Sequence, residues 1–515
     1  MKSRTWMCTT AVSLFAAVAL PIGMDAQNNS SQNHKPNHQK YKLIDLGTLG
    51  GPNSNLSGPD QRVLNNLGTL AAVANTSATN PNPGCYNPFS EPSCFVTHSV
   101  RWRNGVLTDL GTLPGGNNSG TTAISDSGLI VGASENGLVD PLTGLPEANA
   151  VLWEGGNIIN LGAVPGGTES LATVVNIRGQ ITGFSNNGIS DPFSIVGFPT
   201  QTRAFLWQKG ALTDLGTLGG PDALASNENE RGQVAGLSYA NSTPNATTGI
   251  PTLDPFLWED GTMRDLGTLG GTIGYPNWLN NRGQVVGNSN LAGDSAHHPF
   301  LWSKGIIKDL GTLGGANGEA IWINDAGDVA GWAAIPAPCS GCDAPGNQVY
   351  HATLWNEGRI KDLGTVPGDK CSIAFGMNDR GQVVGASGIC HGSLHAFLWE
   401  RGGPMVDVNL LVSPKSDITV LYPWEINVRG EIAAKAVLPS GDHHAVLLVP
   451  DGDCDDDTEA RIAASQTNAA AAAEADPLTG AAVHSGETEG VPINSPPHQF
   501  GQRYHIPGQH VVPPN

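Results

Sequence analysis

The sequence predicts an all-β fold, a β-propeller built from four-stranded blades. Three observations lead to this prediction. Three short phrases recur in constant order, Gly-containing turns separate apolar runs, and the phrases at the two ends of the array complement each other. With only 14% charged residues but 67 glycines among 515 residues, the composition favours short strands and tight turns over long solvated helices.

The first phrase is an Asp-Leu-Gly motif, DLGTLGG, which begins at Asp45. Intact or degenerate copies begin at Asp109, Asn160, Asp214, Asp265, Asp309, Asp362 and Asp407. Successive copies are 44 to 64 residues apart. The unit is therefore about 44 residues long with variable insertions, which suits one blade of a propeller.

The second and third phrases each predict a hairpin. MNDRGQVVGAS, from Met377, places an Asn-Asp-Arg-Gly turn between two apolar runs, because Asn and Gly accept the unusual dihedral angles of tight turns. We name these runs strands a and b. HAFLWERGG, from His395, gives strand c and a turn, and the strand that ends at the Asp-Leu-Gly motif is strand d.

The two ends of the array predict how the ring closes. YKLIDLGT, from Tyr41, is a strand d without a preceding a, b or c, and HHAVLLVPDG, from His443, is a strand c without a following d. We expect the first strand to pair with the last one, a 3+1 closure, since open terminal blades would expose unpaired edges. Eight blades are predicted, or seven if the degenerate first or last unit does not form a blade.

These phrases also carry a family resemblance. The chain resembles the HAF-repeat family of extracellular repeat proteins, whose consensus is close to HAFLW…G…DLGTLGG…IN..GQVVG.S. The resemblance covers roughly residues 41–450, and the first and last units depart from the consensus most. It implies a secreted or surface location and no established biochemical activity.

Four segments are expected along the chain. Residues 1–26 have a basic start, an apolar stretch and Ala26 before the cut, as in a cleaved signal peptide. Residues 27–40 are polar and flexible, 41–450 form the propeller, and 451–515 are a low-complexity tail, mostly disordered. The mature chain is expected to have no membrane span and to be secreted, periplasmic or attached to the cell surface.

Export makes disulfides the expected state of the cysteines. Cys85 and Cys94 would close a loop within one insertion. Cys371 and Cys390 straddle a turn expected at Arg380-Gly381, so a cross-strand bridge fits. Cys339 and Cys342 form CSGC, for which a local disulfide is favoured over half a zinc site. Cys454 is left over.

The insertions fall between strands b and c, whereas the a–b and c–d turns are short. In a propeller, the b–c and d–a loops emerge on one face, and variable loops on a rigid scaffold tend to carry function. We therefore expect a ligand on this face. The aromatic residues Trp278, Trp322 and Trp424 on strand a are candidate ligand contacts, with core packing as the alternative.

Other repeated residues are interpreted as structural. The Trp of the third phrase is expected in the core rather than in an aromatic ring for sugars, and the Asp of the first phrase is expected to form hydrogen bonds at a strand end. Hydrogen bonding is likewise preferred to a metal-binding arc for the repeated His position, since residues in different blades rarely converge on one metal. This position comprises His98, His298, His351, His395 and His444.

The functional hypothesis is an exported binding or interaction scaffold, with carbohydrate or protein as its ligand. No catalytic signature, cofactor motif or metal site is identified. The formal charge of −20 argues against a nucleic-acid partner and favours a soluble monomer. The alternative is a secreted enzyme that acts on glycans at the mouth of the propeller.

Overall fold

The recurring phrases fold into short antiparallel strands joined by turns and loops, as their Val, Ile, Phe and Trp content favours. The computed structural model describes residues 39–58, 61–89, 94–339, 348–388, 390, 394–400, 402–413 and 416–451. All of these residues belong to one compact unit, His38–Asn515. The expected signal peptide, the tail from 452 onwards and Cys454 lie outside the described residues.

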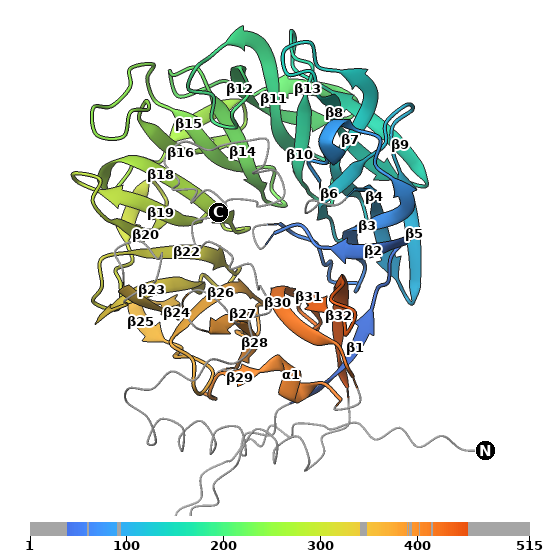
Figure 1. The fold of residues 1–515 in the computed structure, drawn as a ribbon. Coiled ribbons are helices and arrows are strands. Elements are labelled where there is room, and N and C mark those ends of the chain that lie inside the picture. Colours follow the sequence, from blue (N-terminus) through green and yellow to red (C-terminus); the bar gives the residue numbers. More distant parts are fainter. Residues whose placement is uncertain are drawn as a thin grey trace, which may run out of the picture. The chain divides into compact units, whose positions relative to one another are not determined.

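Strands a and b form the first hairpin of each unit. Figure 1 shows the a strands nearest the centre of this unit. The a strands are β2 (Gly50–Asn55), β6 (Ser119–Ile124), β10 (Ser170–Val175), β14 (Ala223–Glu228), β18 (Gly270–Leu279), β22 (Gly318–Ile323), β26 (Cys371–Met377) and β30 (Thr419–Ile426). The b strands are β3 (Leu70–Thr79), β7 (Ile130–Val139), β11 (Ile181–Ser190), β15 (Val234–Tyr239), β19 (Val285–Leu291), β23 (Val329–Pro338), β27 (Val383–Gly388) and β31 (Ile432–Val437).

Strands c and d form the second hairpin. The c strands are β4 (Phe95–Arg103), β8 (Pro146–Glu154), β12 (Thr200–Gln208), β16 (Leu253–Glu259), β20 (His297–Ser303), β24 (Gln348–Asn356), β28 (Leu394–Trp399) and β32 (His443–Asp451). The d strands are β1 (Lys40–Asp45), β5 (Val106–Gly111), β9 (Asn157–Gly162), β13 (Ala211–Asp214), β17 (Thr262–Asp265), β21 (Ile306–Asp309), β25 (Arg359–Asp362) and β29 (Val406–Asp407). Two short helices are η1 (Pro83–Cys85) and α1 (Val408–Leu411).

Within the described residues, the strands form six four-stranded sheets and one eight-stranded sheet. A single parallel pairing, Leu253 with Ile273, joins β16 to β18 in the larger sheet. Divided there, the larger sheet gives two further four-stranded units, β14–β17 and β18–β21. The chain is an all-β propeller, and eight blades stay our prediction for their number.

The N-terminal strand closes the ring as predicted. β1 pairs antiparallel with β32, from Lys40 opposite Asp451 to Asp45 opposite Val446, and completes the sheet that contains β30 and β31. Tyr41 is only 2% exposed and packs in the core of this last sheet. The 3+1 closure is therefore confirmed.

Hydrogen bonds between neighbouring a–b turns link adjacent units, except the second to the third, where Ser125 replaces the donor Asn. The Nδ2 of one turn Asn donates to the main-chain carbonyl at the same position of the next unit, as in Asn280 to Asn324 at 3.0 Å. Asn427 of the last unit donates to Asn65 of the first at 3.1 Å. We call these residues the asparagine ring: Asn65, Asn176, Asn229, Asn280, Asn324, Asn378 and Asn427.

The core lies between neighbouring sheets. One cluster joins Ala235 and Leu257 of one unit to Leu279, Phe300 and Trp302 of the next. The Trp of the third phrase belongs to such clusters, as predicted: five are buried, at 102, 153, 302, 355 and 399, and those at 207 and 258 pack partly buried.

A β-bulge in strand a explains the glycine of GQVVG. Pairing between β10 and β11 shifts between Ala172 and Val174, and the same shift recurs in the other units from β6 onwards. A Cβ on Gly183 of β11 would lie 2.0 Å from the carbonyl oxygen of Leu171. Only glycine fits there, because strand a approaches strand b so closely.

The first unit departs from the expected hairpin. Its strand a is Gly50–Asn55, and near the turn only an isolated bridge, Leu64 with Leu70, remains. Strand a does not run directly into this turn, because the first unit carries extra residues between them. Between the motif Asp and the turn, the first unit is four or five residues longer than the second to seventh units.

Candidate functional site

Four b–c connections project as arms beyond their blades. In each, strand b runs ten residues, and its last residue pairs with the start of strand c after a shift in register. The terminal pairs are Thr79–Phe95, Val139–Pro146, Ser190–Thr200 and Pro338–Gln348. We call these the first, second, third and fourth arms. They lie on the face that the loop lengths predicted as variable.

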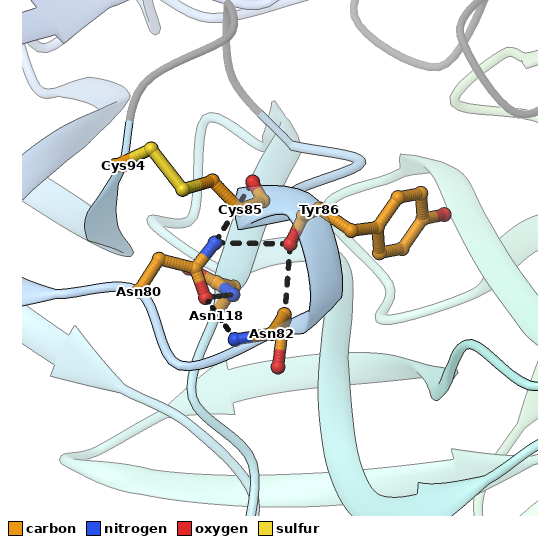
Figure 2. The surroundings of a disulfide bond; sticks show 6 residues. All are labelled: Asn80, Asn82, Cys85, Tyr86, Cys94 and Asn118. Atoms are coloured by element: carbon orange, nitrogen blue, oxygen red, sulfur yellow. Dashed lines mark hydrogen bonds between the residues drawn. A yellow bond between two sulfur atoms is a disulfide. The ribbon is translucent and has the colours of Figure 1, made fainter.

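The first arm is braced by a disulfide and by side-chain amides. Cys85 bonds to Cys94 as predicted, with a Cα–Cα distance of 4.9 Å. Figure 2 shows Asn80 beside this bridge, where its Nδ2 donates to the carbonyl oxygens of Cys85 and Tyr86. Asn118, from the next unit, donates to Asn80 Oδ1. The arm is thus fixed to its neighbouring blade.

A second disulfide, Cys371–Cys390, lies where β26 begins and after β27 ends. The bridge was predicted, but the turn was placed one position too far along. Gly381 N donates to Asn378 O, so the central residues of the turn are 379 and 380. The bulge in β26 then sets Cys371 opposite Gly388 rather than opposite Cys390. Cys339 is also disulfide-bonded, whereas Cys342 lies outside the described residues.

The repeated Asp forms hydrogen bonds at the end of strand d, as predicted. In seven units the first residue of the Asp-Leu-Gly motif accepts the main-chain N–H of the Gly two residues later. In the last copy Asp407 accepts from Asn409 and caps helix α1 instead. This position is therefore part of the turn, and the hydrogen-bonding interpretation is confirmed.

The repeated His pairs with this same Asp across strands c and d. The Nδ1 atoms of His298 and His351 lie 2.9 Å from carboxylate oxygens of Asp309 and Asp362. His98 pairs with Asp109 in the same way.

His444 pairs with Asp45 at 2.8 Å, and so connects the last strand c to the closing strand. His395 differs, since it binds Asp369 rather than the residue at the end of its own strand d. The prediction that these histidines serve in hydrogen bonds is confirmed.

Pairing between His444 and Asp45 shifts the pKa values of both side chains. The hydrogen bond to Asp45 raises the pKa of His444 above its usual range, against the effect of burial. Burial alone would raise the pKa of Asp45, but hydrogen bonds from His444 and Gly47 lower it overall. Among the described residues, no group of three or more His, Cys, Asp or Glu could hold a metal ion.

Other units fill the same two positions with different chemistry. Arg203 forms an ion pair with Asp214 at 2.9 Å, and in the fourth unit Asp254 stands where the others have His, Arg or Asn. Burial, and then the charge of Asp265, raises the pKa of Asp254 to about 6. The two positions thus recur in every unit, but the charges of their side chains differ between units.

The three predicted ligand-contacting tryptophans lie on strand a, as expected. Trp278 and Trp322 stack on each other with ring centroids 3.7 Å apart. Trp424 stacks on Tyr422 at 5.2 Å, and both are 8% exposed. The structure brings Trp278 and Trp322 together but groups Trp424 with Tyr422 and Phe375. Their role in ligand binding stays a prediction.

Extra residues of the first unit fill part of the centre. In Figure 1 the blue segment after β2 runs towards the middle of the ring of a strands. Leu56 is 1% exposed and packs in the cluster that contains Trp424. Arg62 reaches Asp126 of the second unit at 2.9 Å and Glu230 of the fourth at 3.6 Å. Leu56 therefore packs with Trp424, whereas Trp278 and Trp322 belong to a different cluster.

Sequence reasoning missed the exposed aliphatic residues of the arms. Leu138, Val139 and Leu142 on the second arm are each more than 60% exposed, and Ile189 on the third arm is 57% exposed. A signal was present, because GLVDPLTGLPE places apolar residues inside a variable insertion. Without knowledge of the arm's geometry, these residues could equally have been buried.

Comparisons with known proteins give only distant similarities. No family model matches the chain, and no curated protein matches it either. Among solved structures, TolB from Acinetobacter baumannii is 12% identical over 59% of this chain and 77% of its own, with a TM-score of 0.29. A mutant of AofleA from Arthrobotrys oligospora is 12% identical over 63% and 90%, with a TM-score of 0.27. Hydrazine synthase from Kuenenia stuttgartiensis is 9% identical over 67% and 44%, with a TM-score of 0.30.

The described residues contain no helix long and apolar enough to span a membrane. The disulfides fit an oxidising environment outside the cytoplasm.

Proposed function

We propose that this protein is an exported binding scaffold that engages its ligand through the arms, and that the ligand is a protein. The observation that carries the proposal is the exposure of Leu138, Val139, Leu142 and Ile189 on two neighbouring arms. Aliphatic side chains gathered on projecting segments suit a protein surface, since exposed apolar groups of this kind mark interaction sites. Sugar binding would call for exposed aromatic rings instead.

The rigidity of the scaffold supports this proposal. The first arm is cross-linked by Cys85–Cys94, and the arms rise from sheets that are closed in a ring. A preorganised surface loses less conformational entropy on binding. Export and membership of the HAF-repeat family are part of the same proposal, on the strength of the N-terminal sequence and the recurring phrases.

Site-specific photocrosslinking tests the proposal. A photoreactive amino acid is introduced at Leu138 or Ile189 of the mature chain, which is then illuminated with extracellular and envelope proteins of the producing cells. We expect a discrete adduct from both arm positions, and its loss when Leu142→Asp is added, because a charge in an apolar contact typically costs tenfold or more in affinity.

The matched control is Ile306, the first residue of β21, which is 69% exposed. Equal adducts from Ile306 and from the arm positions would contradict a specific arm surface. A glycan array and a hydrolase screen run beside it distinguish the other classes. Glycan binding that Leu142→Asp leaves unchanged, or turnover of a glycan, would replace the proposal with a lectin or a glycan-acting enzyme.

A further inference from the structure

The third arm is attached to the fourth blade through two buried carboxyl groups. Asp191 follows β11, and Asp222 precedes β14. They are 6% and 0% exposed. Asp191 Oδ1 accepts the N–H of Phe193 at 2.9 Å, and Asp222 Oδ2 accepts that of Ile195 at 2.7 Å. The arm's backbone thus turns around both side chains.

The remaining oxygens, Asp191 Oδ2 and Asp222 Oδ1, are buried and have no partner in good hydrogen-bonding geometry, although the Thr202 amide also acts on the Asp222 carboxylate. The two side chains lie within hydrogen-bonding reach of each other. Two ionised carboxylates this close and this buried would repel each other with little solvent to screen them. A proton between them removes one charge and supplies the missing donor.

The first arm has two amides in place of the two carboxyl groups, with the buried carboxylate of Glu135 as a further acceptor. Asn80 follows β3, Asn118 precedes β6, and both therefore hold the positions of Asp191 and Asp222. There Asn118 Nδ2 donates to Asn80 Oδ1, as Figure 2 shows. Asn80 and Asp191 are each followed by Pro. A protonated Asp can replace the amide donor at this junction, whereas an ionised Asp cannot.

We propose that Asp191 and Asp222 share one proton and form a pH-sensitive latch that fastens the third arm to the fourth blade. Loss of the proton leaves two like charges in a dry junction and loosens the arm between residues 191 and 199. The arm carries Ile189, but the latch does not depend on the function proposed above.

The surroundings offer no cation to take over the role of the proton. On β15, the Tyr239 hydroxyl donates to Phe193 O at 2.8 Å and stabilises the arm from another side. Tyr275 on β18 lies near Tyr239. Arg203 on β12 is engaged by Asp214 and by the carbonyl of Pro221.

Burial, with a smaller contribution from Asp191, raises the pKa of Asp222 from 3.8 to about 8, while the amides of Ile195 and Thr202 oppose the shift. Between these two values the folded chain keeps a proton that the unfolded chain has lost. Stability from the latch is therefore complete below about pH 4, falls as the pH rises, and is lost above about pH 8.

Infrared difference spectroscopy of the full mature chain between pH 6 and pH 9 tests the shared proton. We expect a band of buried protonated carboxyl groups at pH 6 that is lost by pH 9, and a smaller loss in Asp222→Asn, where only other groups such as Asp254 titrate. Wild-type protein without such a band would overturn the proposal, and this reading needs no variant to fold.

Hydrogen exchange tests the latch itself. After correction for intrinsic exchange, the protection of the Phe193 and Ile195 amides should fall severalfold from pH 6 to pH 9 in the wild type. The double variant D191N/D222N places the two amides of the first arm at this junction and should keep constant protection. The matched control Asp140→Asn, at the equivalent position of the second arm, should leave the wild-type response in the third arm unchanged.

Two results would overturn the latch. One is the same pH response in D191N/D222N as in the wild type. The other is full restoration of protection at pH 9 by millimolar Ca²⁺, which would show that the pair holds a cation and not a proton.

Discussion

At the scale of single residues, one glycine in each of six units is fixed by a close approach of the backbone. A Cβ on the GQVVG glycine would lie 1.8 to 2.1 Å from a strand a carbonyl in six units. The first and last units carry Ala72 and Ala434 at this position. In the first unit strand a stops at Asn55, and in the last unit a second register shift in β30 changes the pairing. Alanine therefore replaces this glycine in the two units whose strand a pairs differently with strand b.

The same glycine yields a stability prediction. Gly183→Ala should lower the free energy of unfolding by about 1–3 kcal/mol, because the added methyl group would overlap the carbonyl of Leu171. Chemical denaturation measures this change. The control is Ala434→Gly at the equivalent position of the last unit, which should cost less than about 1 kcal/mol. An unchanged or higher free energy of unfolding in Gly183→Ala would contradict the close contact, because the lower entropy of the unfolded alanine variant would then decide the outcome.

At the scale of elements, β1 carries the closure. It supplies the fourth strand of the last sheet, buries Tyr41 and places Asp45 against His444. Without it, the edge of β32 and the core around Tyr41 would meet solvent.

Deletion of residues 41–47 should therefore cost several kcal/mol in unfolding free energy, through lost apolar burial and lost pairing on β32. Thermal unfolding of the deleted chain gives the measurement. A synthetic peptide of residues 39–48 added in trans should recover part of the loss, whereas a scrambled peptide should not. An unchanged unfolding temperature after the deletion would contradict the role of β1.

The elements also show how far sequence reasoning extends. Strand order, the closing strand and two disulfides were predictable, since the recurring phrases carry their own turn chemistry at Asn, Asp and Gly. The bulge in strand a was not, because its cause is a backbone approach between strands. The pairing of Asp191 with Asp222 was hidden as well, since these residues belong to different units and meet only after the sheets assemble. The exposure of Leu138 depends on the arm's projection, which composition does not reveal.

At the scale of the whole molecule, the asparagine ring links the first unit to the last without a covalent bond. Among the described turns, the ring is broken once, at Ser125 of the second unit. Serine has no side-chain amide to donate to the next unit, and the Ser125 hydroxyl bonds to Ser127 instead. The hydrogen bond from Asn427 to Asn65 joins the last unit to the first. The remaining hydrogen bonds of the ring join units that are consecutive in the chain.

Asn427→Ser should therefore lower stability more than Asn229→Ser. Both asparagines make the same bonds within their turns, to the amides two and four residues later. Each loses two hydrogen bonds of its Nδ2, worth about 1 kcal/mol each, one to the next unit and one to Glu431 or Gln233 in its own turn. The fourth and fifth units, however, stay joined by the chain. Urea denaturation of the two variants compares them. Equal midpoints would show that β1 alone maintains the closure.

The antiparallel register of β1 and β32 sets Lys40 directly across from Asp451. A short linker could join these two positions, and the polypeptide could be reopened at an exposed hairpin such as Lys304-Gly305. Such a permuted gene would synthesise the blades in a new order yet specify the same final contacts. The position at which the chain begins thus sets the order of synthesis of the blades but not the fold.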